Sequence, residues 1–508
     1  MCYSFHSNGA RFAIVFCFLW LCSFQHLFAQ KNGQAVGGRQ PYNVLFIFVD
    51  DLRPELGCYG KNYIHSPNID ALAAEGILFT HQFVTVPTCG ASRSGLLTGR
   101  RPRTTDELSN DVLEIKQNSG IALPVPESFV QLFRMNGYNT VGIGKISHSA
   151  DGYIYKYREP KSKRKELPQS WDEMLFDAGK WGTGWNAFFG YADGSNRNER
   201  NYEVKPYENA DVPDDGYPDG LTANLAITKI KELAVQQKPF FLGVGFFKPH
   251  LPFNAPKRYW DLYEEANIPL TPSTYIPQGV NLASLHESNE FNNGYRKSDE
   301  HPTLSQPVSE AYARKLRHAY FAAVSFTDAQ IGKLLSALKA AGLDKNTVVI
   351  LWGDHGWHLG DDRVWGKHTL FDWSLRSPLI MKIPGGAKAV VSNHIISAID
   401  IYPTLMDICG IKVPLNIDGK NFAALLKDPN TKNWNNVAYS YFRKGISLRT
   451  NHYRLTKYYR AEMPDVELYD HRNDPFEREN IAAKYPEIVE RLMPLLERGN
   501  TGLYQPAH

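Results

Sequence analysis

The chain has 508 residues, 43% of them hydrophobic, and its formal net charge is +3. This length allows one large domain and a smaller one, and the composition allows a substantial core. The near balance of charge argues against the strongly basic class of nucleic-acid-binding proteins, so no nucleic-acid partner is expected.

Residues 1–29 are predicted to be a secretory signal peptide. Arg11 precedes the apolar run 12–21, and Ala29 is a suitable residue before a cleavage point. The run is short for a membrane span, and Cys22 does not follow a small residue as lipoprotein processing requires. We therefore expect an exported protein, periplasmic or secreted, without a stable membrane anchor.

Cleavage would leave three cysteines, Cys58, Cys89 and Cys409. Three cysteines do not make a disulfide framework, even in an exported protein. A single Cys58–Cys409 bridge remains open, because the sequence neither supports nor excludes it. The mature protein is therefore expected to be stabilised by its core.

In chain order, apolar runs and helical patterns alternate after a polar lead at 30–40. Continuous apolar runs predict strands buried on both faces, as in a parallel sheet. These runs are 43–49, 140–144, 240–247, 347–352 and 378–383. Helices are predicted at 66–74, directly after Cys89, and at 127–136, 221–233, 309–340 and 402–408. The alternation predicts an α/β domain.

Two stretches, 151–218 and 254–306, show little periodicity. The first contains the basic run 161–165, interpreted as a solvated loop, with contact to an acidic polysaccharide as the alternative. The pattern changes at the C-terminal end, where short strands at 437–442, 445–449, 452–458 and 467–470 precede a helix at 486–497. We therefore expect a large domain over 30–434 and a small α+β subdomain over 435–508.

Polar groups follow four of the predicted strands. They are Asp50 and Asp51, Lys145 with His148, His250, and Asp354 with His355. Ligands of open α/β sheets bind at the carboxyl ends of the strands, so these groups are candidates for one site.

The acidic members of this set suggest a metal. Adjacent carboxylates such as Asp50 and Asp51 cannot both stay ionised cheaply in a cleft without a cation. Together with Asp354 they offer oxygen ligands, which favour Ca²⁺ or Mg²⁺ over zinc. The alternative for the Asp pair alone is a polar strand end or helix cap, and for His355 a core or supporting histidine.

The twelve residues 89–100, CGASRSGLLTGR, indicate an anion-binding site. Small residues after Cys89 predict a turn entering a helix, whose free N–H groups favour an anion. Arg93 adds a planar fork suited to a sulfate or phosphate group. A lone cysteine here would be interpreted as a buried structural thiol, but the whole pattern resembles the signature of the sulfatase family.

Further segments resemble the branch of that family typified by iduronate-2-sulfatase. They are GKISH at 144–148, FKPHLPF at 247–253, GDHGWHLG at 353–360, WGK at 365–367 and a closing segment at 467–480. The resemblance covers roughly residues 42–497. It implies an alkaline-phosphatase-like fold, with a large mixed sheet flanked by helices and a small C-terminal subdomain.

The resemblance also implies a chemistry. In this family the cysteine at position 89 is oxidised to formylglycine (3-oxoalanine), whose hydrate attacks sulfur. One Ca²⁺ is implied, with the metal site made by Asp50, Asp51, Cys89, Asp354 and His355. A formylglycine-generating or anaerobic sulfatase-maturating enzyme is implied as a partner, and a sulfated oligo- or polysaccharide as substrate.

The remaining implied roles concern charge and protons. Arg93, Lys145 and Lys367 would neutralise charge on the sulfuryl oxygens. His250 would give a proton to the leaving sugar oxygen, and His148 would act as the base or orienting group that helps to expel sulfate. Around His148 the chain departs from the iduronate enzyme, because Ser147 and Ser149 replace a Phe and a Pro.

The sequence therefore favours an exported sulfuric ester hydrolase, with a 2-O-sulfated uronate as the leading substrate. Three alternatives stay open: a sulfatase for another sugar of an algal polysaccharide, a phosphomonoester or phosphonate hydrolase of the same superfamily, and a silent carbohydrate-binding protein. His368, Arg363, Trp365 and the two aperiodic stretches are candidates to line the sugar subsite.

Overall fold

The structure is a computed structural model that describes residues 41–120, 124–429, 431, 434 and 437–504. The predicted signal peptide and the polar lead at 30–40 lie outside the described residues. So does residue 435, at which the C-terminal subdomain is predicted to begin. Within the described ranges, no helix is both long and apolar enough to cross a membrane.

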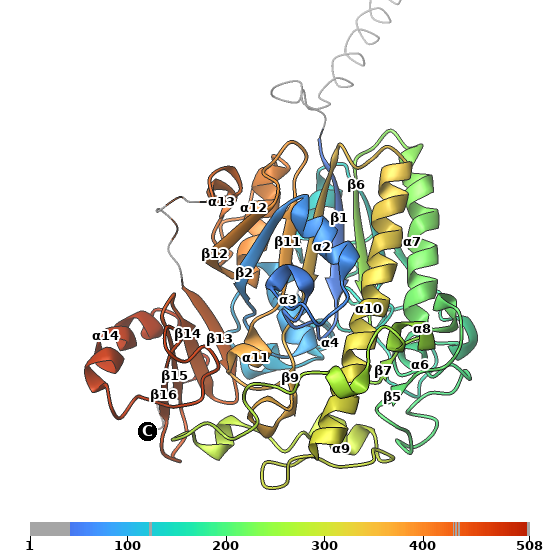
Figure 1. Cartoon of the computed structure of the whole chain (residues 1–508). Coiled ribbons are helices and arrows are strands. Elements are labelled where there is room, and N and C mark those ends of the chain that lie inside the picture. The colour runs from blue at the N-terminus through green and yellow to red at the C-terminus, as the bar shows by residue number, and fades with distance from the viewer. Residues whose placement is uncertain (1–40, 121–123, 430, 432–433, 435–436, 505–508) are drawn as a thin grey trace, which may run out of the picture. The chain divides into compact units, whose positions relative to one another are not determined.

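An eight-stranded mixed sheet forms the centre of the fold (Figure 1). Its strands, in spatial order, are β12 (Val390–Ser397), β2 (Ile77–Phe83), β11 (Leu379–Lys382), β8 (Thr347–Gly353), β1 (Asn43–Val49), β6 (Phe240–Phe246), β3 (Asn139–Gly144) and β4 (Glu173–Leu175). Neighbours pair in parallel except at β11, which is antiparallel to both β8 and β2. The five predicted strands are confirmed, whereas β2, β12 and β4 were not predicted.

The strand β1 shows why an unbroken apolar run marks the centre of this sheet. Leu45, Ile47 and Val49 belong to the core on one face, and the alternate residues 44, 46 and 48 belong to the core on the other. Both faces are covered by helices, so every residue of the strand is buried. This sandwich arrangement leaves the ends of the strands as the places where polar groups can gather.

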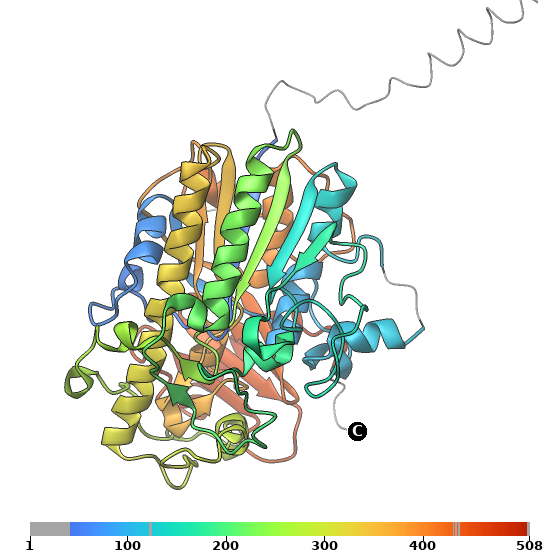
Figure 2. The same cartoon turned by 90° about the vertical axis from the view of Figure 1, so that its right-hand side faces the viewer.

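Two sets of helices cover the sheet, as Figures 1 and 2 show. The first set packs on the core that contains Leu45 and consists of α2 (Pro67–Ala74), α7 (Pro218–Ala234) and α10 (Glu310–Ala340). The second set packs on the opposite core and consists of α3 (Cys89–Thr98), α5 (Phe129–Met135) and α12 (Ile401–Ile408). The layered α/β fold predicted from the alternation is therefore confirmed.

The two aperiodic stretches contain short elements. The first includes β4, α6 (Gly184–Phe188) and β5 (Tyr207–Glu208), and the second includes α8 (Lys257–Trp260) and α9 (Asn289–Gly294). The basic run 161–165 is largely exposed, and Lys161 forms an ion pair of 3.1 Å with Asp151. This agrees with the interpretation of the run as a solvated loop.

The C-terminal segment forms a separate antiparallel sheet. Its strands follow chain order: β13 (Ala438–Phe442), β14 (Gly445–Arg449), β15 (Tyr453–Tyr458) and β16 (Val466–Asp470). The helix α14 (Pro486–Glu497) packs its buried residues Leu492 and Leu496 on this sheet, in a core separate from the two around the large sheet. The small α+β subdomain is therefore present.

The cysteines do not form the bridge that the sequence left open. Cys58, Cys89 and Cys409 are all free. Cys58 packs against the core on one face of the large sheet and Cys409 against the core on the other. The sheet separates them, so they cannot pair.

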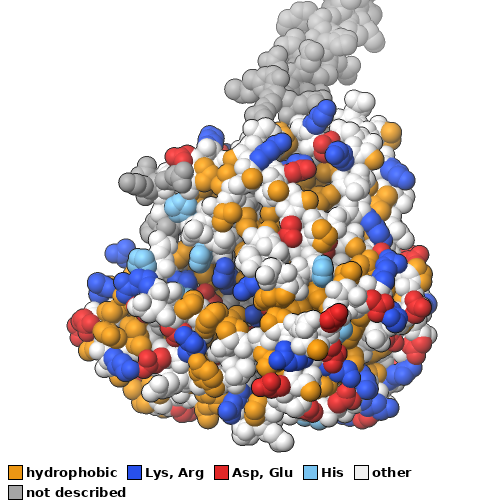
Figure 3. All heavy atoms as spheres, viewed as in Figure 1, with side chains coloured by type: hydrophobic (Ala, Val, Ile, Leu, Met, Phe, Trp, Pro, Cys, Tyr) orange, Lys and Arg blue, Asp and Glu red, His pale blue; other side chains and the backbone are white. Residues whose placement is uncertain are grey.

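Charged side chains of both signs are interspersed over the face in Figure 3, in keeping with the small net charge.

Candidate active site

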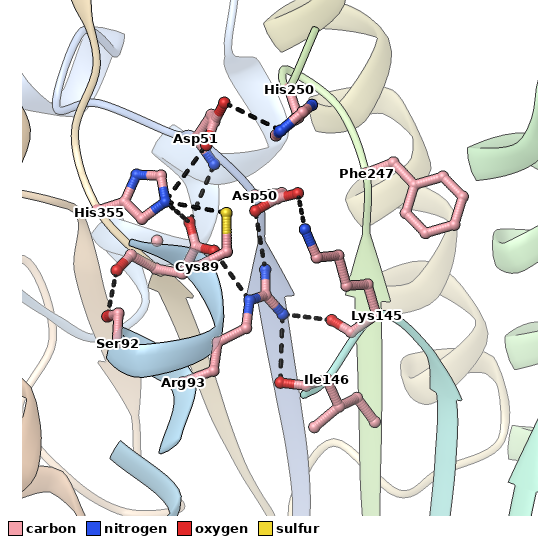
Figure 4. Close-up of polar contacts among 12 residues, drawn as sticks. Asp50, Asp51, Cys89, Ser92, Arg93, Lys145, Ile146, Phe247, His250 and His355 are labelled. Carbon is pink, nitrogen blue, oxygen red and sulfur yellow. Dashed lines mark hydrogen bonds and ion pairs between the residues drawn. The ribbon is translucent and has the colours of Figure 1, made fainter. Parts of the chain in front are cut away.

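The site lies where four neighbouring strands of the large sheet end. Strand β1 pairs with β6 and β8, and β6 pairs with β3, with Val49 opposite both Phe246 and Gly353. The residues that follow these strands therefore meet at one edge, which Figure 4 shows in close-up. The structure brings together Asp50, Asp51, Lys145, His250, Asp354 and His355, the strand-end residues singled out in the sequence, apart from His148.

Helix α3 delivers Cys89 to this edge. Cys89 is the first residue of the helix, follows the extended Thr88, and is only 2% exposed. Gly90 is required next to it, because a Cβ at this position would lie 2.1 Å from the carbonyl oxygen of Asn110. The hydroxyl of Ser92 donates to the carbonyl oxygen of Asp354 at 2.5 Å, which ties the helix to the end of β8.

Arg93 holds three strand ends together. Its Nε lies 2.8 Å from Asp354 Oδ2, and its Nη2 lies 3.4 Å from Asp50 Oδ1. Its Nη1 donates to the backbone carbonyls of Lys145 and Ile146. The side chain is fully buried, so solvent does not screen the attraction between this guanidinium and the carboxylates around it.

Buried carboxylates and a thiol form a cluster that fits a metal ion. The ligand atoms of Asp50, Cys89, Asp354 and His355 all lie within 4.8 Å of one another. Asp51 joins Cys89 and His250 in an overlapping group, and its N–H donates to Asp354 Oδ1 at 3.0 Å. The three carboxylates are 0% exposed, and such a group of oxygen donors is the kind that a hard divalent cation takes.

The two adjacent carboxylates have opposite pKa shifts. Burial raises the pKa of Asp51 well above its usual value, and Lys367 opposes this only in part. Burial also acts to raise the pKa of Asp50, but Lys145, His250 and Arg93 together hold it well below its usual value. The sequence argument that this pair needs positive charge nearby therefore agrees with the geometry.

Two lysines supply part of that charge. Lys145 Nζ lies 2.5 Å from Asp50 Oδ2. Lys367, on the loop after β10 (Trp365–Gly366), has its Nζ 2.9 Å from Asp51 Oδ1 and 3.4 Å from Cys89 Sγ. Lys145 thus contacts one carboxylate of the adjacent pair and Lys367 contacts the other, which places two positive charges at this edge of the sheet.

His250 is held with both ring nitrogens facing oxygen. Nδ1 lies 2.6 Å from the carbonyl oxygen of Leu251, and Nε2 lies 3.2 Å from Glu290 Oε1 and 3.7 Å from Asp51 Oδ2. Burial and then Lys367 lower the pKa of this ring to about 3, whereas the carboxylates of Asp50 and Glu290 act to raise it. Both ring nitrogens face acceptors, and these contacts oppose the effect of burial on the pKa.

Glu290 is a site residue that sequence reasoning missed. It lies on α9, within the stretch 254–306, whose sequence shows little periodicity. Although burial acts to raise its pKa, Lys367 and His250 hold it well below its usual value. A single glutamate in an aperiodic insertion gives no signal in the sequence, so only the folded chain shows it.

His148 lies on the loop after β3, outside the cluster but near enough for the charge of Lys145 to act on its pKa. Its ring contacts Trp185, with 5.3 Å between centroids, and its Nδ1 lies 3.9 Å from Asp111 Oδ1. Burial and the nearby Lys145 hold its pKa well below the usual value, so the ring is neutral. Its position leaves Nε2 as the nitrogen without a described partner, which suits a proton acceptor.

The three suggested subsite residues differ in position. Trp365 is 2% exposed and belongs to the core on one face of the large sheet. Arg363 donates to the carbonyl oxygen of Leu304 at 3.0 Å. His368 stacks on Phe442, with 5.5 Å between centroids, and is close enough for the charges of Glu290 and Lys367 to act on its pKa, which is lowered chiefly by burial.

The loop around His148 is held by a buried carboxylate, and this predicts a pH effect on stability. Glu166 accepts hydrogen bonds from the Ser147 hydroxyl and, at 2.9 Å, from the Ser149 N–H, the two residues in which this chain departs from the iduronate branch. Burial raises the pKa of Glu166 from 4.5 to about 7. The folded state therefore prefers the protonated form, and its contribution to stability is lost as the pH rises through 7.

We expect Glu166→Gln, which keeps an acceptor oxygen, to remove this loss. As the pH rises from 4.5 to 8, the free energy of unfolding of the wild type should fall by about 3 kcal/mol more than that of the variant. Urea unfolding across that range would measure it, with the exposed Glu159→Gln as control. Parallel curves for wild type and Glu166→Gln would contradict the assignment.

Comparison with known proteins agrees with this geometry. The sulfatase family model matches residues 42–411, and the model for the C-terminal part of N-sulphoglucosamine sulphohydrolase matches residues 353–501. Iduronate 2-sulfatase of Mus musculus is 31% identical over 427 residues, which cover 76% of this chain and 72% of that protein.

Solved structures show the same fold. A 2-O GAG sulfatase superposes with a TM-score of 0.67 and 22% identity, covering 91% of this chain and 92% of the other. The phosphonate monoester hydrolase of Silicibacter pomeroyi superposes with a TM-score of 0.70 and 21% identity, covering 90% and 95%. The chain therefore belongs to the sulfatase family, the hydrolases of sulfuric esters, and resembles its iduronate-2-sulfatase branch.

Proposed function

We propose that this sulfatase removes the 2-O-sulfate of a uronic acid residue in a glycosaminoglycan fragment. The observation that supports the chemistry is the meeting of Cys89 with three buried carboxylates and three cations at one sheet edge. Similarity to an iduronate 2-sulfatase and to a 2-O GAG sulfatase supports the sugar.

Cys89 is the residue that we propose to be converted to formylglycine, whose hydrate would supply the oxygen nucleophile. Its place at the first turn of α3 lets the N-terminal N–H groups of the helix face the same anion. A formylglycine-generating or anaerobic sulfatase-maturating enzyme would make this change. Asp50, Asp51, Asp354 and His355 would hold one Ca²⁺, which would sharpen the nucleophile and polarise the sulfate.

The side chains of this chain would do the rest. Arg93, Lys145 and Lys367 would face the sulfuryl oxygens and offset the charge that grows on them, and losing one such donor costs about 10²–10³ in rate. His250 would donate from Nε2 to the leaving sugar oxygen. His148, neutral and beside Lys145, would accept the proton when sulfate is expelled.

One other enzymatic function has an observation in its favour. The structural similarity to a phosphonate monoester hydrolase shows that this fold also accommodates phosphorus esters. Another sulfated sugar, such as one from an algal polysaccharide, would use the same residues with a different subsite. A silent carbohydrate-binding protein is the least favoured alternative, because every proposed catalytic position is filled.

We further propose that residues 1–29 direct export to the periplasm or the medium.

The test is release of inorganic sulfate from a panel of sulfated saccharides that includes a 2-O-sulfated uronate disaccharide. The protein would be co-expressed with a formylglycine-generating enzyme. We expect release from the 2-O-sulfated uronate and little from 6-O- or N-sulfated glucosamine. Release from a different sugar would overturn the substrate assignment but keep the chemistry. Faster hydrolysis of phosphonate or phosphate monoesters, measured as release of the alcohol or phenol, would overturn both.

A further inference from the structure

The insertion between β7 (Phe253–Asn254) and α10 contributes a residue to the reaction centre. Helix α9 has only six residues, yet its start is fixed to the loop that contains Lys367. The Trp365 N–H donates to the Ser288 hydroxyl at 3.0 Å, and His286 Nε2 contacts the carbonyl oxygen of Lys367. His286 Nδ1 in turn accepts from the Ser288 N–H at 3.0 Å.

This fixation places the Glu290 carboxylate between two proposed catalytic groups. Oε1 lies 3.2 Å from His250 Nε2, and Oε2 lies 3.5 Å from Lys367 Nζ. Oε2 has no hydrogen-bond partner among the described residues, although it is buried. The ion pair with Lys367 therefore compensates the charge on this oxygen.

Glu290 differs from the other acidic groups of the site in what it contacts. Asp51 also binds Lys367, but in the proposed enzyme the Asp51 carboxylate is shared with the metal ion. Among the described groups with proposed roles, Glu290 forms ion pairs with His250 and Lys367. If Asp51 binds the metal ion, Glu290 is therefore the carboxylate that remains paired with His250 and Lys367.

We propose that Glu290 is a positioning residue for the leaving-group side of the reaction, an inference that rests on the proposed function. It holds the His250 ring through Nε2 until the substrate takes over that contact, and it keeps Lys367 directed at the sulfuryl group. The proton that His250 gives goes to the leaving oxygen as the S–O bond breaks. Glu290 acts through these two groups and does not itself exchange a proton with substrate.

Leaving-group dependence tests this proposal. 4-Nitrophenolate is a stable anion and leaves without being protonated, whereas phenolate leaves more easily when it receives a proton. Loss of a positioned proton donor therefore slows hydrolysis of phenyl sulfate more than hydrolysis of 4-nitrophenyl sulfate. For Glu290→Gln we expect kcat on phenyl sulfate to fall about 10²-fold and kcat on 4-nitrophenyl sulfate to fall less than about 5-fold. KM for both esters should stay within about 3-fold.

Two variants complete the design. Glu290→Asp keeps the charge and should recover part of the rate on phenyl sulfate. Glu287→Gln makes the same charge change in the same insertion, on an exposed side chain that accepts from the Leu304 N–H at 2.8 Å, and should leave both rates unchanged. Equal losses on the two esters in Glu290→Gln, or an effect confined to KM, would overturn the proposal.

The comparison uses only aryl sulfates, so it does not depend on the sugar. If aryl sulfates are hydrolysed with the expected pattern but the 2-O-sulfated uronate is not, the substrate assignment fails and the role of Glu290 stands. If the uronate is hydrolysed but the two aryl esters respond equally to Glu290→Gln, the role fails and the substrate assignment stands.

Discussion

Replacing Cys89 by alanine is expected to reduce the rate of sulfate release by at least about 10⁴-fold, to the background of the assay. Alanine cannot be oxidised to formylglycine, so the proposed nucleophile is lost. The fold should persist, because Cys89 occupies a small buried position at the first turn of α3, where alanine has high helix propensity. Activity would be measured as sulfate release from the best substrate of the panel.

The chain offers a matched control for this variant. Cys409 is also a free cysteine, and it packs against the core on the face that holds α3 but away from the site, so Cys409→Ala should keep full activity. Mass spectrometry of the peptide around residue 89 would show the mass of 3-oxoalanine in the wild type. Full activity in Cys89→Ala, or an active wild type with an unmodified thiol, would overturn the proposed nucleophile.

Removal of the divalent cation is expected to lower activity at least about 10²-fold and to lower the melting temperature as well. The reason is that Asp50, Asp51 and Asp354 are all 0% exposed, so their charges are not screened by solvent and a bound cation interacts strongly with them. Dialysis against a chelator, followed by titration with Ca²⁺ or Mg²⁺, would measure both effects.

A variant separates the proposed site from other metal-binding groups. Asp354→Asn keeps the shape of the side chain but removes one charged ligand, so it should weaken cation binding in calorimetry and reduce activity together. Asp261→Asn removes an exposed carboxylate that pairs with Lys257 at 2.5 Å, and should change neither. Full activity in protein shown by elemental analysis to be metal-free would contradict the cation's role.

The central strands and the residues that follow them could be predicted from the sequence. Strands buried on both faces must be apolar throughout, so β1, β6 and β8 are visible as continuous runs. Because parallel strands end at the same edge, the polar residues directly after them, such as Asp50 and Asp354, were predicted to meet, and their ligand atoms do. A local pattern was enough here because position along the strand fixes position in space.

The strand β12 and the positions of Trp365 and Glu290 could not be predicted from local patterns in the sequence. Strand β12 contains polar residues and a register irregularity between Ser392 and Ile395, so its pattern does not alternate cleanly. Trp365 is buried by residues distant in sequence, which no local pattern reports. Glu290 reaches Lys367, 77 positions further along the chain, because contacts from Ser288 and His286 fix α9 to that loop. Contacts of this kind depend on the closure of long loops, and their partners become visible only when the chain is folded.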